Sequence, residues 1–363
     1  METKILKPTE ENIRLAAEII RNGGLVAFST ETVYGLGANA LDSAAAAKIY
    51  EVKGRPSDNP MIVHIARASD IGQLTPRLSP DIVTLIDTFW PGPLTMVVKR
   101  KALVPDVTTG GLDTVAVRMP DNIAALALIN EAGCPIAAPS ANLSGRPSPT
   151  KAQHVIDDLS GKIEAVLAGE DCRVGIESTV VDMTGEIPTI LRPGILTAED
   201  ISAALGKKVE YDKSLFVHPS RFPKENGCRE KICTESSAAK SKDSDDLNAG
   251  FDDDFKPKSP GMKYKHYAPK AEMVVVEGQR DNVKAEIERL KMLNERLGNK
   301  VGVILFEEKA FIEAAHDLFA DLRQMDKEDV DLILAGALSD NDGVGFAVMN
   351  RMLKSAGYNI VKV

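Results

Sequence analysis

Helical and extended hydrophobic patterns alternate from residue 9 to about residue 211, and this alternation restricts the fold more than any other feature of the sequence. Thr9 can cap a helix in which apolar residues recur every three or four positions. Residues 25–28 then form an apolar run typical of a buried strand, and the next helix begins at Asp42 or Ser43. A chain that alternates in this way is predicted to fold as an α/β domain, with a sheet covered by helices.

The same signals continue through the rest of this region. Ser79 followed by Pro80 is an N-cap with proline at the first helical position. Thr197 has Asp200 three residues later, which is the spacing of a capping box for a short final helix. Further strands are predicted at residues 61–65, 94–98, 114–117 and 135–138. We therefore expect residues 1–211 to form one domain.

The composition changes after this region. From 212 to about 258 the chain is rich in Ser, Lys, Asp, Glu and Pro and poor in large apolar residues, so it is predicted to be a linker that cannot fold alone. Beyond it, strands are expected at 273–276 and 301–306, with an amphipathic helix at about 280–297 between them. Residues 270–363 are therefore predicted to form a second, smaller α/β domain, joined to the first by residues 212–269.

Length, charge and cysteine content narrow the function further. A chain of 363 residues has room for two or three domains at roughly 150 residues each. Its net charge of −9 gives no general attraction to nucleic acid or to an anionic membrane, so a polyanion would need a local cluster of basic side chains. The four cysteines are too few and too irregular for a disulfide framework, which favours a reducing compartment. Because no apolar run approaches the roughly 18 residues of a spanning helix, a soluble cytoplasmic protein is expected.

Polar residues follow predicted strands at 29–32, at Arg118 and at 139–142, and Lys53 and Arg55 lie between a helix and a strand. Four basic residues in all lie beside small hydroxyl and amide side chains and glycines: Lys53, Arg55, Arg118 and Arg192. Open α/β sheets place their ligand crevice at the ends of strands. Guanidinium groups bind phosphates and carboxylates with two hydrogen bonds, so the set predicts a nucleotide and a small acid as ligands. The alternative is that each is a solvated residue at the rim of the sheet. His64 has the corresponding alternative of a satisfied structural histidine.

Neither of two common nucleotide-binding motifs accounts for these residues. The pattern G-x-x-x-x-G-K-[ST] does not occur in the sequence, which excludes a P-loop ATPase. Residues 35–40 match the looser dinucleotide pattern G-x-G-x-x-A, but residues 30–34 separate them from the preceding strand, where a tight turn is needed. Cys134 lies in an apolar context and is expected in the core, whereas Cys228 and Cys233 lack the second pair of ligands that a zinc site needs.

Seven segments follow one another along the first region: Ser-Thr-Glu-Thr-Val-Tyr-Gly-Leu-Gly at 29–37, Lys-Gly-Arg-Pro at 53–56, Asn-Pro-Met-Ile-Val-His at 59–64, Thr-Val-Ala-Val-Arg at 114–118, Ala-Pro-Ser-Ala-Asn-Leu-Ser-Gly-Arg-Pro-Ser-Pro-Thr at 138–150, Glu-Ser-Thr-Val-Val-Asp at 177–182 and Leu-Arg-Pro-Gly at 191–194. Together they resemble the threonylcarbamoyl-AMP synthase family, the YrdC-type enzymes that begin synthesis of the threonylcarbamoyl group of transfer RNA. Ser-Pro-Gly-Met-Lys-Tyr-Lys-His-Tyr-Ala-Pro at 259–269 and the second domain resemble the long, two-domain branch of that family. Ser29 departs from the family pattern, which usually has proline there, but no functional side chain is lost.

The resemblance implies a YrdC-like N-terminal domain with a twisted mixed α/β sheet and an open cavity, and a smaller Rossmann-like C-terminal α/β domain. It implies a nucleotidyltransferase reaction in which L-threonine, bicarbonate and ATP give threonylcarbamoyl-AMP and pyrophosphate, with Mg²⁺ as the divalent cation. The product would pass to the downstream transfer RNA threonylcarbamoyl transferase machinery. The resemblance adds no membrane partner and allows at most weak RNA binding.

The resemblance also implies roles for individual residues of this chain. Lys53 and Arg55 would be catalytic, and no metal ligand is assigned. The residues implied for L-threonine are Thr32, His64, Arg118, Ala138 and Ser178, with Arg118 paired to the carboxylate. Those implied for ATP are Arg55, Asn59, Ala116, Ser140, Asn142, Ser148, Arg192, Tyr264 and Tyr267. His266 would belong to a lid formed by residues 259–269, which closes over the cavity.

Two other functions compete with this reading. A concave basic surface on such a domain could bind double-stranded RNA, although the overall acidity and the 5% aromatic content argue against RNA binding as the main role. The second competing function is carbamoyl transfer from carbamoyl phosphate, as in hydrogenase-maturation proteins with a related domain. That activity needs acylphosphatase and zinc-finger segments, and neither is recognisable in the sequence.

Overall fold

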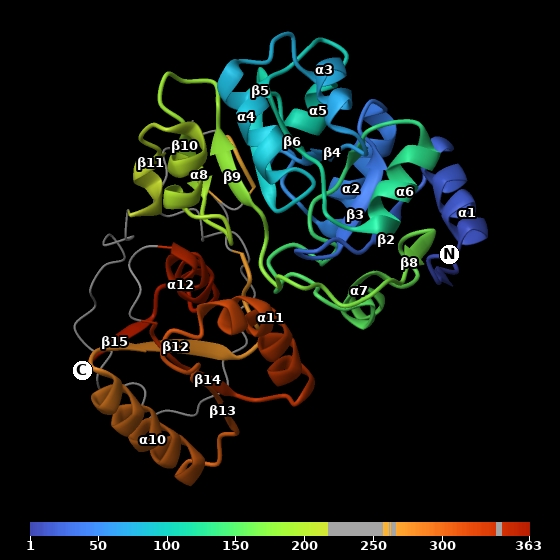
Figure 1. The fold of residues 1–363 in the computed structure, drawn as a ribbon. Coiled ribbons are helices and arrows are strands. Elements are labelled where there is room, and N and C mark those ends of the chain that lie inside the picture. The colour runs from blue at the N-terminus through green and yellow to red at the C-terminus, as the bar shows by residue number, and fades with distance from the viewer. Residues whose placement is uncertain (217–256, 261, 263–265, 339–342) are drawn as a thin grey trace.

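The computed structural model describes residues 1–216, 257–260, 262, 266–338 and 343–363, and Figure 1 shows two sheets within them. The larger sheet has eleven strands in the order β1-β8-β2-β3-β7-β4-β6-β5-β9-β10-β11. Their bounds are β1 (Lys4–Leu6), β2 (Val26–Phe28), β3 (Gly35–Asn39), β4 (Ile62–His64), β5 (Leu94–Lys99), β6 (Thr114–Arg118), β7 (Ile136–Ala137), β8 (Ala165–Leu167), β9 (Thr179–Asp182), β10 (Thr189–Arg192) and β11 (Glu210–Tyr211). Parallel pairs such as β4 with β6 and antiparallel pairs such as β5 with β6 both occur, so the predicted mixed sheet is confirmed.

Helices cover this sheet, and the predicted capping residues begin them. Their bounds are α1 (Glu10–Arg21), α2 (Ser43–Lys53), η1 (Ala68–Asp70), α3 (Ile71–Leu74), α4 (Pro80–Phe89), α5 (Asp106–Thr109), α6 (Ile123–Ala132), α7 (Ala152–Leu159), α8 (Ala198–Leu205) and η2 (Lys213–Leu215). The side chains of Thr9, Asp42 and Ser79 each accept a hydrogen bond from a backbone N–H in the first turn of α1, α2 and α4. Thr197 and Asp200 form the predicted capping box of α8. Each of these bonds satisfies a donor that has no partner within its helix.

The core of this part lies on both faces of the sheet, because successive residues of a strand point in opposite directions. In β2, Val26 and Phe28 belong to the apolar cluster beneath α1 and α6, whereas Ala27 belongs to the cluster beneath α2, α4 and α8. Burial on both faces explains why β2 appears in the sequence as a continuous apolar run instead of an alternating one.

Strand β3 was not expected from the sequence, and it explains the glycine pattern at residues 35–40. Gly35 and Gly37 pair with β2 in antiparallel register. A Cβ atom added to Gly37 would lie 2.8 Å from the Phe28 ring and 2.8 Å from the Ile136 side chain. These glycines therefore allow close packing inside a sheet and do not form a phosphate-binding turn, which agrees with the rejection of the dinucleotide motif.

The smaller sheet has four parallel strands in the order β13-β14-β12-β15. Their bounds are β12 (Glu272–Glu277), β13 (Val301–Ile304), β14 (Leu332–Gly336) and β15 (Ile360–Lys362), and the helices are α10 (Arg280–Arg296), α11 (Phe311–Lys327) and α12 (Gly343–Ser355). The expected strand at 301–306 ends at Ile304. This sheet confirms the predicted second α/β part.

Helices α11 and α12 lie on the side of the smaller sheet that faces the larger part (Figure 1). Val33 and Ile176 from the larger part join the same apolar cluster as Leu318 of α11 and Val348 of α12, together with Tyr267 from the connecting segment. The two parts therefore share a core. Most of the predicted linker, with Cys228, Cys233 and Tyr264, lies outside the described residues. Among the described helices, none is long and apolar enough to cross a membrane.

Candidate active site

One cavity of about 50 Å³ collects most of the predicted site residues. Strands β4, β6 and β10 each end in a residue that lines it, namely His64, Arg118 and Arg192. The complete lining is Thr30, Val33, Gly35, Arg55, Ile62, His64, Arg118, Ala138, Pro139, Ser140, Glu177, Ser178, Arg192, Pro260, His266 and Tyr267. A space of this size holds far less than a nucleotide, since drug-sized ligands occupy pockets of roughly 300 Å³ or more. Ligand entry therefore requires the walls to move.

Other predicted residues lie directly behind this lining and contact it. They are Thr32, bonded to Arg118, Lys53, bonded to the Ser140 carbonyl, Asn59, bonded to Arg55, Ala116, paired with Ile62, Asn142, bonded to Ser140, and Ser148, bonded to Glu177. Of the residues proposed from the sequence, Tyr264 alone lies outside the described part of the chain. The topology thus brings together segments that are up to 235 residues apart, from Thr32 to Tyr267 (267 − 32).

Arg118 ends β6 inside the protein and is held by three neighbours. Its Nη1 donates to Thr32 Oγ1 at 2.9 Å and its Nε donates to the Gly92 carbonyl at 3.3 Å. Its Nη2 lies 2.7 Å from Glu31 Oε2, and only 4% and 2% of the two side chains are exposed. The N–H of Nη2 does not point at that oxygen, so the ion pair leaves both Glu31 oxygens without a hydrogen bond. A ligand carboxylate would meet a guanidinium that already has a charged but poorly aligned partner.

Ser178 and Arg192 also line the cavity and contact each other. Arg192 donates from Nε to the Ser178 carbonyl and from Nη2 to Ser178 Oγ, both at 3.1 Å. Ser178 Oγ is also 2.8 Å from Thr95 Oγ1 on β5. Because Ser178 precedes β9 and Arg192 ends β10, the antiparallel pairing of these strands brings the two residues together. The arrangement presents a hydroxyl and a cation side by side to the cavity.

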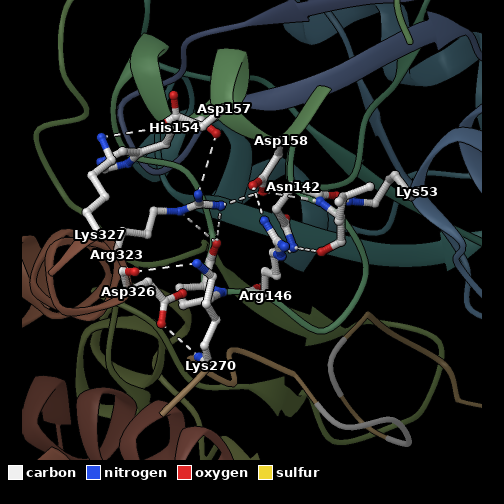
Figure 2. A network of polar contacts seen from close by, with 12 residues as sticks. Lys53, Asn142, Arg146, His154, Asp157, Asp158, Lys270, Arg323, Asp326 and Lys327 are labelled. Atoms are coloured by element: carbon white, nitrogen blue, oxygen red, sulfur yellow. Dashed lines mark hydrogen bonds and ion pairs between the residues drawn. The ribbon is translucent and has the colours of Figure 1, made fainter. Parts of the chain in front are cut away.

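The segment from Ser140 to Ser148, here called the nucleotide loop, is organised around Lys53. The Lys53 ammonium, at the end of α2, donates to the carbonyl of Ser140 at 2.5 Å and to the carbonyl of Asn142. The Asn142 side chain donates in turn to the carbonyls of Leu143 and Arg146, as Figure 2 shows in part. Lys53 therefore fixes this loop in the state described, and its charge lies next to the cavity without lining it.

The cations around the cavity exceed the anions, and removal from solvent perturbs them. Desolvation, reinforced by the nearby Arg55, lowers the pKa of Lys53 well below its ordinary value. Desolvation likewise lowers the pKa of Arg55 and of Arg192 to about 10. Glu177 lines the cavity close to Arg192, and it is the one carboxylate in that lining. Concentrated positive charge in a partly dehydrated space favours a ligand with several negative charges.

His64 is buried and neutral. Burial, together with the charge of Arg118, lowers its pKa to about 3. Its ring packs edge-on against Phe28, and its Nδ1 atom has no hydrogen-bond partner in the structure. An unpaired buried nitrogen costs free energy until a ligand or water reaches it, which favours a ligand contact. The backbone at Ile62 and Ile136 also interacts with the ring, so the alternative of a structural histidine stays open.

The sequence did not single out several residues of the cavity, chiefly Glu177 and the buried Glu31. Both lie in segments that resemble the family, 177–182 and 29–37. A carboxylate inside an otherwise buried run was the one sign in the sequence that these residues belong to the site. Their partners, Arg351 and Arg118, are 174 and 87 residues away, and no local pattern predicts such pairs. The remaining unpredicted lining residues are Thr30, Val33, Gly35, Ile62, Pro139 and Pro260.

Comparison with known proteins places this site in a family. The model of the family Sua5_yciO_yrdC, described as telomere recombination, matches residues 18–194, and that of the threonylcarbamoyl-AMP synthase C-terminal domain matches residues 197–357. The threonylcarbamoyl-AMP synthase of Pyrococcus abyssi is 46% identical, over 98% of this chain and 96% of its own length. That of Bacillus subtilis is 42% identical, over 99% and 97%. A solved structure of Pyrococcus abyssi Sua5 complexed with L-threonine superposes with a TM-score of 0.83 at 44% identity, over 100% of this chain and 99% of that one. The chain therefore belongs to the threonylcarbamoyl-AMP synthase family, with both of its domain models present.

Proposed function

We propose that this protein makes threonylcarbamoyl-AMP and pyrophosphate from L-threonine, bicarbonate and ATP, as a nucleotidyltransferase that supplies the modification of transfer RNA. The observation that carries the proposal is one cavity lined by three arginines, Arg55, Arg118 and Arg192, which can bind the phosphates of a nucleotide and the carboxylate of an amino acid together. The relatives named threonylcarbamoyl-AMP synthase support it, since they align over almost the full length of both chains.

In this proposal L-threonine lies between Arg118, His64 and Ser178. The guanidinium of Arg118 binds the carboxylate, and the unpaired Nδ1 of His64 faces a polar group of the amino acid. Thr32 orients Arg118 through the 2.9 Å hydrogen bond, and Ala138 contributes to the wall. A solved relative described as complexed with L-threonine supports an amino acid ligand.

ATP lies on the side of Lys53, Arg55 and Arg192, with the nucleotide loop beneath it. Bicarbonate takes up a proton and loses water to give CO₂. The neutral amine of threonine attacks its carbon and releases a proton, which gives a carbamate, and a carbamate oxygen then attacks the α-phosphorus as the bond to pyrophosphate breaks. Lys53, Arg55 and Arg192 offset the negative charge that builds on the α-phosphate and on the leaving group. Asn59, Ala116, Ser140, Asn142, Ser148 and Tyr267 complete this side.

Mg²⁺ enters this scheme with the phosphates of ATP. Within the described residues there is no group of three or more His, Cys, Asp or Glu side chains that could hold a metal ion. We therefore propose that Mg²⁺ would be bound mainly by the substrate phosphates and water, as is common for nucleotide enzymes. Bound in that way, the ion neutralises charge on the leaving pyrophosphate.

Pro260, His266 and Tyr267 supply the wall on the side of the connecting segment. We propose that residues 259–269 act as a lid, because the carbamate is labile in water and the cavity must exclude water while the carbamate is transferred. We further propose a cytoplasmic enzyme that passes its product to the transfer RNA threonylcarbamoyl transferase. The cations of the cavity are buried or partly buried inside the protein, which disfavours the competing role as an RNA-binding surface.

The test is substrate dependence. Purified protein should release pyrophosphate from ATP only when threonine and bicarbonate are both present, with the adenylate product identified by its mass. Equal pyrophosphate release without threonine would contradict the proposal. A salt titration of RNA binding separates the competing role, since phosphate-driven binding weakens steeply with salt.

A further inference from the structure

The nucleotide loop, residues 140–148, lies between the end of β7 and the start of α7 and has almost no regular structure of its own. Such a segment cannot satisfy its polar groups through a helix or a sheet ladder, so other parts of the chain must do so. The loop carries Ser140, Asn142 and Ser148, which the proposed function places beside ATP. What holds the loop therefore controls the ATP side of the cavity.

Arg323 of α11 reaches this loop from the C-terminal domain. Its side chain is 7% exposed, and both Nε and Nη2 donate to the Pro147 carbonyl, at 3.1 and 2.7 Å. Nη2 also donates to Asp158 Oδ2 at 2.8 Å. Figure 2 shows the guanidinium between α7 and the loop, pointing away from its own domain. A guanidinium can bind a carbonyl and a carboxylate at once because its donors form a rigid fork.

Asp158 connects this arginine to the rest of the loop. Its Oδ1 accepts from Arg146 Nη1 at 2.9 Å and its Oδ2 accepts from the backbone N–H of Leu143 at 3.3 Å. Burial by itself would raise the pKa of Asp158, but Arg323 and Arg146 outweigh it and hold the pKa below its ordinary value. One ionised carboxylate therefore joins two positions of the loop to the C-terminal domain (Figure 2).

A second arginine of the C-terminal domain acts on the end of the same loop. Arg351 of α12 is fully buried, and its Nε lies 3.2 Å from Glu177 Oε2. Glu177 Oε1 accepts a 2.6 Å hydrogen bond from the hydroxyl of Ser148. In addition, the backbone N–H of Ala268, just before the second sheet, donates to the Gly145 carbonyl at 2.7 Å.

We propose that Arg323 and Arg351 are positioning residues through which the C-terminal domain sets the geometry of the nucleotide loop for ATP. The inference rests on the proposed function and adds a role for the second domain in it. Neither arginine lines the cavity: Arg323 acts on the loop directly at Pro147 and through Asp158, and Arg351 acts through Glu177. Loss of either contact lets the loop relax, which displaces Ser140 and Asn142 and leaves Arg118 and His64 in place.

Arg323→Lys is the main variant, because it keeps the charge beside Asp158 and loses the fork to Pro147. We expect its KM for ATP to rise by about tenfold to hundredfold, as is typical when a reacting group is misplaced by about 1 Å. The KM for threonine should change less than about twofold on the same basis. Direct titration of the protein with ATP should show the same loss of affinity. Arg280→Ala is the matched control, since the hydrogen bonds of Arg280 within the described part of the chain are to Phe306 and Glu307 of its own domain.

A purely structural role gives a different result. In that case Arg323→Lys lowers the melting temperature and changes both KM values equally, or leaves both unchanged, and either outcome overturns the proposal. Asp158→Asn and the double variant with Arg323→Lys provide a second check: the effects on ATP affinity should be far from additive, because the two side chains are in direct contact and hold the same loop. Additive effects would also overturn it. A wild-type protein without threonine-dependent pyrophosphate release would instead contradict the proposed function.

Discussion

The carboxylate of Glu31 lies 2.7 Å from the guanidinium of Arg118, and both side chains are almost completely buried. Glu31 therefore places next to Arg118 a negative charge like the one that the resemblance expects from the threonine carboxylate. A ligand carboxylate must therefore compete with this buried ion pair for the fork of Arg118. Threonine binding is expected to displace Glu31 or to share the guanidinium with it.

Glu31→Gln tests this relationship. Removal of one partner of a buried ion pair typically costs about 3–5 kcal/mol, so the free energy of unfolding should fall. Threonine, whose carboxylate replaces the missing charge, should raise the melting temperature of the variant more than that of the wild type. Asp121→Asn is the control, because its partner Arg173 is mostly exposed and such pairs contribute little. Equal stabilisation of both proteins by threonine would contradict the expectation.

Arg118→Ala should weaken threonine binding by about 3–5 kcal/mol if the guanidinium meets the carboxylate in this dehydrated cavity. The KM for ATP should change less, since the proposed contacts of ATP are with Lys53, Arg55 and Arg192. The variant leaves Glu31 unpaired, so circular dichroism must first confirm that it folds, and a double variant with Glu31→Gln relieves that charge. Wild-type threonine dependence in a folded variant would refute the assignment.

His64 should make the protein less stable in acid. Its pKa is about 3 in the folded protein, against about 6.5 when unfolded. Between these values the unfolded chain binds a proton that the folded protein does not, so the free energy of unfolding falls as the pH drops from 6.5 toward 3. His64→Gln should flatten this fall in thermal melts, and His316→Gln, at an exposed position, should not. Parallel curves for His64→Gln and the wild type would exclude the effect.

Tyr267 should keep water out of the cavity. It is 6% exposed, and its ring stacks on Phe319 with centroids 5.1 Å apart. Tyr267→Ala opens this wall, so more of the carbamate should be lost before transfer, and the yield of threonylcarbamoyl-AMP in a fixed time should fall. Tyr267→Phe retains the stacked ring and should keep a yield close to that of the wild type. An unchanged yield in the Ala variant would show that the segment is not a lid.

Local sequence signals predicted where helices begin. They did not predict the strands β3 and β1. Thr9, Asp42 and Ser79 identify helix starts because a cap involves only the next few residues. Strand β3 contains Gly35 and Gly37, although glycine ordinarily weakens a strand. Glycine is needed at position 37 because Phe28 and Ile136 leave no room there for a side chain. The three-residue strand β1 pairs with β8, and Lys4 opposes Ala165, so nothing near β1 indicates it.

The residues of the candidate site likewise fall into those that the sequence predicted and those that it did not. Arg55, His64, Arg118 and Arg192 were recognisable because their segments resemble a known family, and all four line the cavity. Arg323 and Arg351 were not, since each lies on an amphipathic helix of the second domain and acts through carboxylates that are distant in the sequence. Long-range ion pairs carry no sequence periodicity, so only the three-dimensional structure reveals them.

The core shared by Val33, Ile176 and the helices α11 and α12 affects how the protein is made. On the ribosome, the eleven strands of the larger sheet are synthesised before α11 and α12, so the apolar patch around Val33 and Ile176 stays uncovered while the second domain is being translated. The nascent first domain therefore exposes this apolar surface to aggregation until α11 and α12 emerge and cover it. Calorimetry of the finished protein should accordingly show one cooperative melting peak instead of two.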